Sequence, residues 1–183
     1  MIISISGEAG SGKSTIAKIL AAKLGFQRYY IGGIRRDMAK KKGMTLAEYN
    51  KLGETDPATD KEVDKFQKQL GETEDNFIIE GRTSWYFIPH SLKIYLDVDE
   101  KVGAERIFND LKKNEKRNED NNLNSAEDVL KSNRERKKSD NKRYRKYYGI
   151  DAYNKVNYDL AIDTTDKSPK KVVKKILNFI KNK

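Results

Sequence analysis

The stretch that decides the fold is Met1-Ile2-Ile3-Ser4-Ile5-Ser6 followed by Gly7-Glu8-Ala9-Gly10-Ser11-Gly12-Lys13-Ser14-Thr15. The first six residues form a short, β-branched apolar run, which is typical of a strand buried in a parallel sheet. After the glycine-rich segment, apolar residues recur at helical spacing until Gly25 ends the pattern. The chain therefore begins with a strand, a glycine-rich loop and a helix.

The glycine-rich segment fits the pattern Gly-x-x-x-x-Gly-Lys-Ser, and it has the strand and the helix that this pattern requires on either side. Its glycines let the backbone N–H groups surround a phosphate, and the start of the helix adds a positive end. We interpret it as a P-loop that binds ATP. The predicted ATP-binding residues are Gly7, Glu8, Ala9, Gly10, Ser11, Gly12, Lys13, Ser14 and Thr15.

Two side chains of the loop have predicted roles in chemistry. Lys13 should bridge the β- and γ-phosphates, and Ser14 should bind Mg²⁺ through its hydroxyl. Magnesium takes oxygen ligands, so a nearby carboxylate should support Ser14. Glu80, at the end of a later strand, is the candidate, and Asp97 is the alternative.

The rest of the chain repeats the alternation of strands and helices. Apolar runs at 76–80, 92–96 and 158–163 predict three further strands, and Ser168-Pro169 predicts the start of a final helix. Such alternation predicts an α/β protein with a doubly wound parallel sheet and helices on both faces. Together with the loop, this is the P-loop NTPase fold.

The chain has 183 residues, which suits one domain spanning 1–183. Two segments interrupt the alternation. Residues 33–71 read as about three helical segments without a strand, and 110–124 is a polar run. Because ligands of this fold lie at the carboxyl ends of the strands, we expect a helical acceptor-binding insertion at 33–71 and a lid at 110–124.

The composition narrows the class of function. No cysteine and one histidine, His90, exclude thiolate catalysis, disulfides and a site built on several imidazoles. The net charge of +10 suits either nucleic acid or two phosphate-bearing substrates. The start of the chain shows neither a signal peptide nor a membrane span, so we expect a cytoplasmic protein. We also expect a monomer.

Arginines outside the loop point to a second phosphate-bearing substrate, because the guanidinium fork matches phosphate oxygens. Arg35-Arg36 opens a helix, and Arg82 follows the strand that ends Glu80-Gly81. Arg136, Asp140 and Arg143 are spaced by four and three residues, which puts them on one face of a helix.

At these residues the chain resembles the nucleoside monophosphate kinases, and in particular the archaeal-type cytidylate kinases. The similar segments run almost end to end: Gly7 to Thr15, Gly32 to Ala39, Lys42 to Thr45, Glu80 to Arg82, Arg134 to Arg136, Ser139-Asp140, Arg143-Tyr144, Tyr148 to Asp151 and Tyr158 to Leu160. The resemblance implies Mg²⁺-assisted phosphoryl transfer from ATP to CMP or dCMP.

The resemblance also implies roles for single residues. Arg36, Arg82 and Arg143 would hold the acceptor phosphate. Arg136 and Asp140 would contact the acceptor sugar or phosphate. Lys13, Arg82, Arg136 and Arg143 would be the catalytic residues.

Two features depart from the family pattern. Arg35 stands where the family usually has an aromatic residue, and the expected lid lacks an obvious arginine pair. Arg106, Lys113 and Arg117 are the candidates for neutralising the transferred charge.

The acceptor base is not settled by these residues. Thr83, Ser84 and Trp85 lie close enough along the chain to contact it, and Trp85-Tyr86-Phe87 could stack on it or belong to the core. One alternative function is a kinase of AMP, UMP or a non-nucleotide. Adenylate kinases usually carry Asp-Gly-Phe-Pro-Arg where this chain has Glu-Gly-Arg. Another is a P-loop factor that binds nucleic acid through the basic stretch 134–146.

Overall fold

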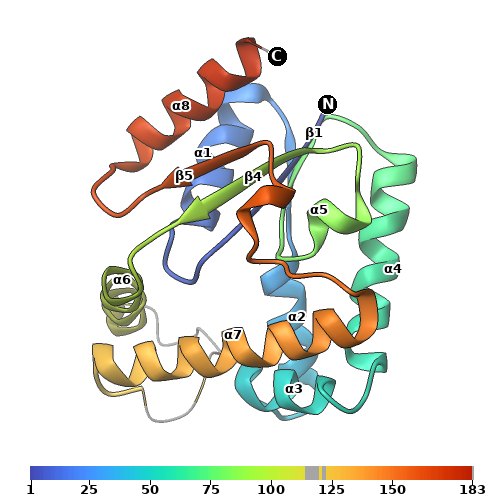
Figure 1. Ribbon diagram of the computed structural model, residues 1–183, viewed down its shortest axis with the longest axis vertical. Coiled ribbons are helices and arrows are strands. Elements are labelled where there is room, and N and C mark those ends of the chain that lie inside the picture. Colours follow the sequence, from blue (N-terminus) through green and yellow to red (C-terminus); the bar gives the residue numbers. More distant parts are fainter. Residues whose placement is uncertain (114–119, 121–122, 183) are drawn as a thin grey trace.

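The computed structural model describes residues 1–113, 120 and 123–182, and its centre is a five-stranded sheet (Figure 1). The strand order is β2-β3-β1-β4-β5, and each neighbouring pair is parallel. The strands are β1 (Ile2–Gly7), β2 (Gln27–Tyr30), β3 (Phe77–Glu80), β4 (Leu92–Asp97) and β5 (Leu160–Asp163).

Eight α-helices and one 3₁₀ turn join the strands within the described residues. They are α1 (Lys13–Leu24), α2 (Ile31–Lys41), α3 (Leu46–Gly53), α4 (Ala58–Thr73), α5 (Ser84–Phe87), α6 (Glu100–Lys113), α7 (Ala126–Tyr148), η1 (Lys155–Asn157) and α8 (Pro169–Lys181). The Thr45 and Glu48 side chains form a capping box that starts α3. None of the described helices is both long and apolar enough to cross a bilayer.

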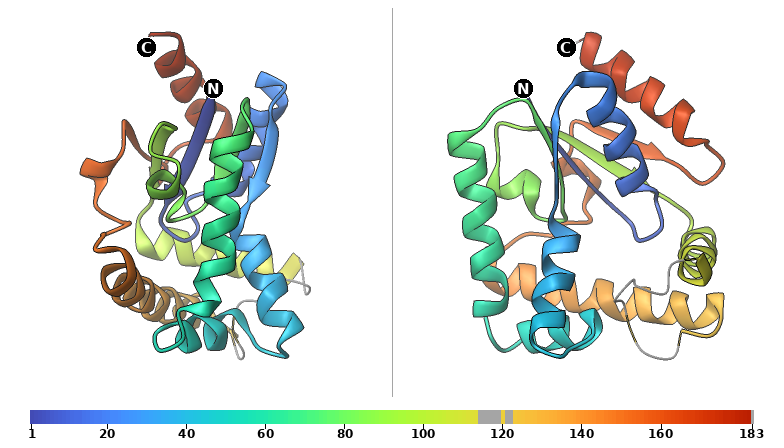
Figure 2. Two further views of the ribbon diagram at one scale, coloured as in Figure 1. Left: turned by 90° about the vertical axis from the view of Figure 1, so that its right-hand side faces the viewer. Right: turned by 180° about the vertical axis from the view of Figure 1, so that it is seen from behind.

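Helices cover both faces of the sheet because successive strand side chains point to opposite faces. Ile3 and Ile5 of β1 pack in one cluster with apolar residues of α1 and α8. Ile2 and the β3 residue Ile79 pack in a second cluster with residues of α2 and α4 on the other face. Figure 2 shows α1 beside α8, with α4 away from both. The predicted P-loop α/β fold is confirmed.

The sequence pattern predicts four of the five strands, at positions that correspond to β1, β3, β4 and β5. It does not predict the fifth, Gln27–Tyr30. This segment is an edge strand, paired only with β3 among the described strands, and none of its residues is fully buried. Its residues, Gln-Arg-Tyr-Tyr, therefore lack the apolar run that marks the other strands. The omission matters because β2 carries Arg28 and Tyr30.

Helices α2, α3 and α7 lie beyond the carboxyl ends of the strands (Figure 1). The expected helical segments between 33 and 71 correspond to α2, α3 and α4. The segment expected to be a lid, 110–124, lies largely outside the described residues, which leave out 114–119, 121 and 122. Arg117 is one of those residues, whereas Lys113 is the last residue of α6.

The apolar core between β4 and α1 yields a stability prediction. Ile94 on β4 is fully buried between α1 and its neighbours, so Ile94→Ala should lower the free energy of unfolding by about 2–5 kcal/mol. Urea denaturation measures this. Val156 is 82% exposed, so Val156→Ala is the control and should change stability by less than about 0.5 kcal/mol. Equal effects of the two substitutions would contradict the assigned core.

Candidate active site

The P-loop connects β1 to α1 and fits against β4 and α6 with no room for side chains at two glycines. Gly7 and Gly10 have φ angles of 139° and 76°, which L side chains rarely adopt. A Cβ on Gly7 would lie 2.0 Å from the Leu96 carbonyl oxygen, and one on Gly10 would lie 2.2 Å from that of Gly103. These contacts, in addition to the phosphate-binding pattern, explain why glycine stands at both positions.

Lys13, the first residue of α1, lies inside the loop. Its Nζ donates to the carbonyl oxygens of Gly7 at 2.9 Å and Glu8 at 2.5 Å. Burial lowers the pKa of Lys13 to about 7, and the positive charges of Arg82 and Arg136 add to this effect. Glu80 and Glu8 oppose it only in part. The positive charge around Lys13 therefore exceeds the negative charge of the nearby acids. This excess favours the binding of an anion.

Ser14 and Glu80 meet at the mouth of the loop, as the predicted magnesium site requires. The Ser14 hydroxyl donates to Glu80 Oε2 at 2.6 Å. The other carboxylate oxygen, Oε1, accepts from Arg28 Nε at 2.6 Å. No group of three or more acids or imidazoles placed to hold a metal ion occurs among the described residues. This sparse set of oxygens fits Mg²⁺, which draws most of its ligands from water and phosphates.

Asp97, the alternative metal ligand, has other contacts. It ends β4, and its carboxylate pairs with Lys155 of η1 and accepts from the backbone N–H of Val98. It does not line the cavity at the P-loop. The structure thus favours Glu80 over Asp97.

The P-loop opens into a cavity of about 570 Å³, which we call the central cavity. It is lined by the loop and by residues of α2, α4, α6, α7 and the segment after β3. Cationic side chains from several elements line it, among them four that were predicted as site residues: Lys13, Arg36, Arg82 and Arg136. The structure thus brings these four predicted residues to one space, although 123 residues of sequence separate the first from the last.

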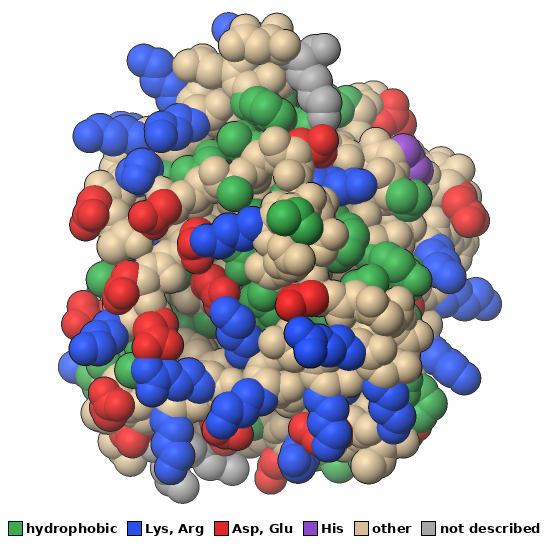
Figure 3. Space-filling model, in the orientation of Figure 1, with side chains coloured by type: hydrophobic (Ala, Val, Ile, Leu, Met, Phe, Trp, Pro, Cys, Tyr) green, Lys and Arg blue, Asp and Glu red, His purple; other side chains and the backbone are tan. Residues whose placement is uncertain are grey.

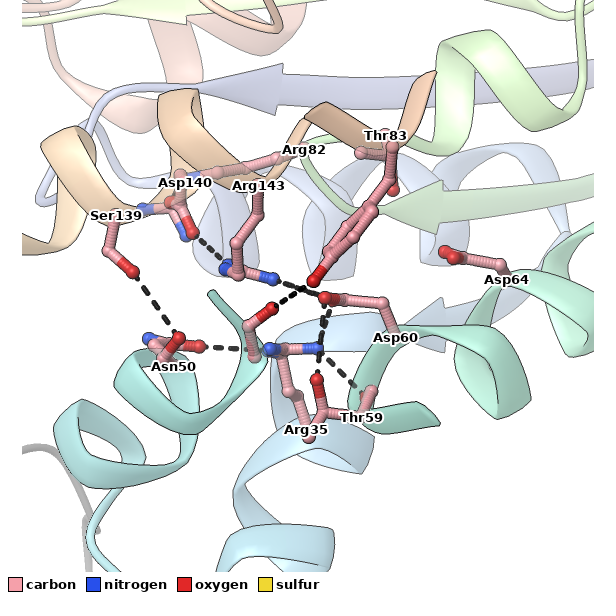
Figure 4. Close-up of polar contacts among 12 residues, drawn as sticks. Arg35, Asn50, Thr59, Asp60, Asp64, Arg82, Thr83, Ser139, Asp140 and Arg143 are labelled. Atoms are coloured by element: carbon pink, nitrogen blue, oxygen red, sulfur yellow. Dashed lines mark hydrogen bonds and ion pairs between the residues drawn. The ribbon is translucent and has the colours of Figure 1, made fainter. Parts of the chain in front are cut away.

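A group of buried charges lies beside the central cavity (Figure 4). Asp60 of α4 accepts from Arg35 at 2.5 Å and from Arg143 at 2.6 and 2.7 Å. Asp140 accepts from Arg143 at 2.5 Å and pairs with Arg82 Nε at 3.1 Å. We call Arg35, Asp60, Arg143, Asp140 and Arg82 the buried charge network.

The network places two predicted acceptor residues away from the cavity surface. Arg143 is 0% exposed and Asp140 is 1% exposed, and neither lines the central cavity. Arg82, which Asp140 holds, does line it. In this structure Arg143 and Asp140 therefore do not line the cavity themselves. They are connected to it through Arg82, with which Asp140 pairs.

Sequence reasoning did not single out Asp60, although a signal was present. Asp60, Val63, Asp64 and Gln67 are spaced by three, one and three residues, which puts them on the inner face of α4. Val63, Asp60 and Gln67 are buried. Polar residues on the buried face of an amphipathic helix require partners, and that requirement could have indicated the network.

The remaining sequence candidates fall in different places. None of Trp85, Tyr86 and Phe87 lines the central cavity. Trp85 and Phe87 are buried, so the core interpretation fits these two, whereas Tyr86 is 38% exposed. Thr83 lines the cavity, whereas the Ser84 hydroxyl donates to Gln67 at 2.6 Å.

Arg106 of α6 lines the cavity on the P-loop side. It donates to the backbone carbonyl oxygens of Thr164 at 3.0 Å and Thr165 at 2.8 Å. The guanidinium therefore ties α6 to the segment between β5 and α8. His90 is exposed.

The P-loop at the end of the central strand and the cations converging on one cavity define the protein as a P-loop kinase. Residues 2–166 match the cytidylate kinase-like family. The chain belongs to this family, which confirms the predicted resemblance and the predicted enzyme class, a nucleoside monophosphate kinase.

Individual relatives agree with the family match. The chain is 40% identical over 171 residues to the cytidylate kinase of Natronomonas pharaonis, covering 92% of this chain and 83% of that protein. It is 36% identical over 181 residues to the cytidylate kinase of Methanobrevibacter smithii, covering 99% of each. The crystal structure of shikimate kinase from Bacteroides thetaiotaomicron is 12% identical with a TM-score of 0.64, over 99% of this chain and 98% of that one. This last similarity shows the fold.

The buried charge network yields a prediction about pH. Burial raises the pKa of Asp140, but Arg82, Arg143 and Arg136 outweigh it and hold the pKa at about 2, below the ordinary value of 3.8. Asp140 therefore stabilises the fold fully above about pH 4 and loses this effect as the pH falls toward its folded pKa. Asp140→Asn should cost about 3–5 kcal/mol near neutral pH, because it leaves buried arginines underpaired.

The measurement is the free energy of unfolding in urea from about pH 7 down to about pH 3. The gap between wild type and Asp140→Asn should narrow as the pH falls. Asp166→Asn, at an exposed position, is the control and should stay close to wild type throughout. A gap that stays constant with pH would contradict the role assigned to the Asp140 charge.

Proposed function

We propose that the protein phosphorylates CMP or dCMP with ATP as the donor, assisted by Mg²⁺. The observation that carries the proposal is the convergence of Lys13, Arg36, Arg82 and Arg136 on one cavity that is continuous with the P-loop. A donor γ-phosphate and an acceptor phosphate must lie side by side for transfer, and this cavity supplies cations for both.

On the donor side, the P-loop amides and Lys13 would hold the ATP phosphates. Ser14 and Glu80 would hold Mg²⁺, which when bound neutralises charge on the phosphates. Arg28 pairs with Glu80 and so keeps Glu80 Oε2 directed at Ser14. Arg106, beside the loop, is the described candidate for neutralising the transferred group.

On the acceptor side, Arg36, Arg82 and Arg136 would hold the phosphate of the nucleoside monophosphate. The acceptor phosphate is itself an ionised nucleophile near neutral pH, so the reaction needs no general base. The work of the side chains is to align the two phosphates and to compensate charge in the transition state. Arg143 and Asp140 would contribute by holding Arg82 in place.

Cytidylate is the favoured acceptor because the relatives from N. pharaonis and M. smithii are both cytidylate kinases, with similarity that extends over at least 92% of this chain. The chain also has Glu-Gly-Arg after β3 rather than the Asp-Gly-Phe-Pro-Arg of adenylate kinases. We propose that residues 33–71 form the acceptor-binding insertion of a single domain.

The nucleic-acid alternative receives less support from the structure. Its basis was the basic stretch 134–146, which lies on α7. Most of those cations are paired: Arg134 with Glu100, Lys137 with Glu8, Lys138 with Glu135, Lys142 with Glu54 and Arg143 with Asp60. Figure 3 shows acidic side chains interspersed with basic ones over this part of the surface. A backbone of phosphates would need an unpaired cationic stripe.

A first prediction tests the donor site. Lys13→Ala should lower kcat by about 10²–10³-fold, because it removes the positive charge that compensates the transferred phosphate. The thermal melt should change little. Lys18→Ala is the matched control, since Lys18 is an exposed lysine on the same helix. Full activity of Lys13→Ala would remove the P-loop from the proposed mechanism.

A second prediction tests the acceptor. With ATP as donor, kcat/KM for CMP or dCMP should exceed that for UMP, AMP and GMP by at least about tenfold. Release of ADP, measured for each nucleotide in turn, gives these values. A preference for AMP, or no turnover of any monophosphate, would refute the cytidylate assignment and leave the ATP site standing.

A further inference from the structure

Asp64 of α4 is an acid that lines the central cavity without taking part in the buried charge network. It lies one helical turn beyond Asp60, on the same inner face of α4. Asp60 is occupied by Arg35 and Arg143. No ion pair of Asp64 with a cation is found among the described residues. Both acids line the cavity, but the Asp60 carboxylate is held by two arginines and that of Asp64 is not.

One oxygen of this carboxylate is held by the protein. The Tyr148 hydroxyl, from the end of α7, donates to Asp64 Oδ2. The described residues supply no hydrogen bond to Oδ1. The tyrosine thus holds the orientation of the carboxylate and leaves one acceptor atom for a ligand in the cavity.

The central cavity is lined by uncharged side chains as well as by its cations. Val63, Thr83 and Tyr144 line the cavity together with Asp64, in the same space as Arg35 and Arg82. An apolar side chain, a hydroxyl and an aromatic ring suit a nucleobase better than a phosphate.

We propose that Asp64 determines base specificity by accepting a hydrogen bond from the exocyclic amino group of the cytosine ring. This inference rests on the proposed function. Cytosine carries an amino donor at the position where uracil carries a carbonyl acceptor. An ionised carboxylate oxygen stabilises the first and repels the second, so a closed cavity would reject UMP through an unpaired, repulsive contact.

The charge state of Asp64 supports this role. Burial raises its pKa to about 6, while the Tyr148 hydroxyl and the cations Arg35 and Arg143 lower it and Asp60 raises it. The acid is therefore mostly ionised near neutral pH and becomes protonated under mildly acidic conditions. A protonated carboxyl can donate to the uracil carbonyl, so selectivity for CMP over UMP should fall as the pH drops through about 6.

Asp64→Asn is the decisive substitution because it changes charge without changing shape. The Tyr148 hydroxyl still needs an acceptor, so the asparagine oxygen should turn toward Tyr148 and its NH₂ group toward the cavity. The group facing the base then becomes a donor. The ratio of kcat/KM for CMP to that for UMP should fall by about 10–100-fold, with KM for ATP unchanged.

Glu62→Gln is the matched control, since Glu62 is an exposed acid on the same helix, and it should keep the wild-type ratio. Thermal melts of both variants report whether they fold. The pH dependence of the ratio is a second readout, in which titration of the phosphate cancels because both nucleotides carry it. The wild-type ratio should fall below about pH 6, and that of Asp64→Asn should not.

Each outcome separates this inference from the function on which it rests. A wild-type protein that prefers CMP, with an unchanged ratio in folded Asp64→Asn, would overturn the role of Asp64 and leave the proposed function intact. A wild-type protein that phosphorylates neither CMP nor UMP would overturn the proposed function, and the role of Asp64 with it. A CMP-to-UMP ratio of kcat/KM that falls in Asp64→Asn but not in Glu62→Gln supports both the role of Asp64 and the proposed function.

Discussion

The pairing of buried charges is the constraint on which the acceptor side of the structure depends. An unpaired ion in a protein interior costs several kcal/mol, so each buried arginine must meet a carboxylate. Asp60 satisfies Arg35 and Arg143, and Asp140 satisfies Arg143 and Arg82. These contacts join α2, α4, α7 and the segment after β3, so one set of ion pairs holds together four of the elements that surround the central cavity.

The P-loop side follows a different rule, because its cations outnumber the acids near them. The loop holds Lys13 among Arg82 and Arg136, whose charges help to lower its pKa. Such positive charge is tolerated in a partly solvated cavity and becomes favourable when phosphates enter it. The two sides of the site thus differ: ion pairs hold the acceptor-side elements together, and the positive charge gathered around Lys13 favours phosphate groups.

Arg28, Asp60 and Asp64 show how a tertiary contact gives an unremarkable residue a role. Arg28 lies on an edge strand and takes one oxygen of Glu80, so that the other oxygen faces Ser14. Asp60 and Asp64 share one face of α4, yet one is bound by two arginines and the other by a tyrosine hydroxyl. The difference between a structural acid and a ligand-facing acid here is the identity of its partners.

By itself, the sequence determined the P-loop, strands β1, β3, β4 and β5, the helical segment between 33 and 71, and the family. These features depend on local periods and on a contiguous motif, which a single chain displays directly. Only the tertiary structure decided that Gln27–Tyr30 is a strand, that Arg143 and Asp140 are buried, and that Asp64 lines the cavity. A short edge strand has no apolar run, and the partner of a charge comes from a distant part of the chain. Such pairings exist only once the fold has brought the partners together.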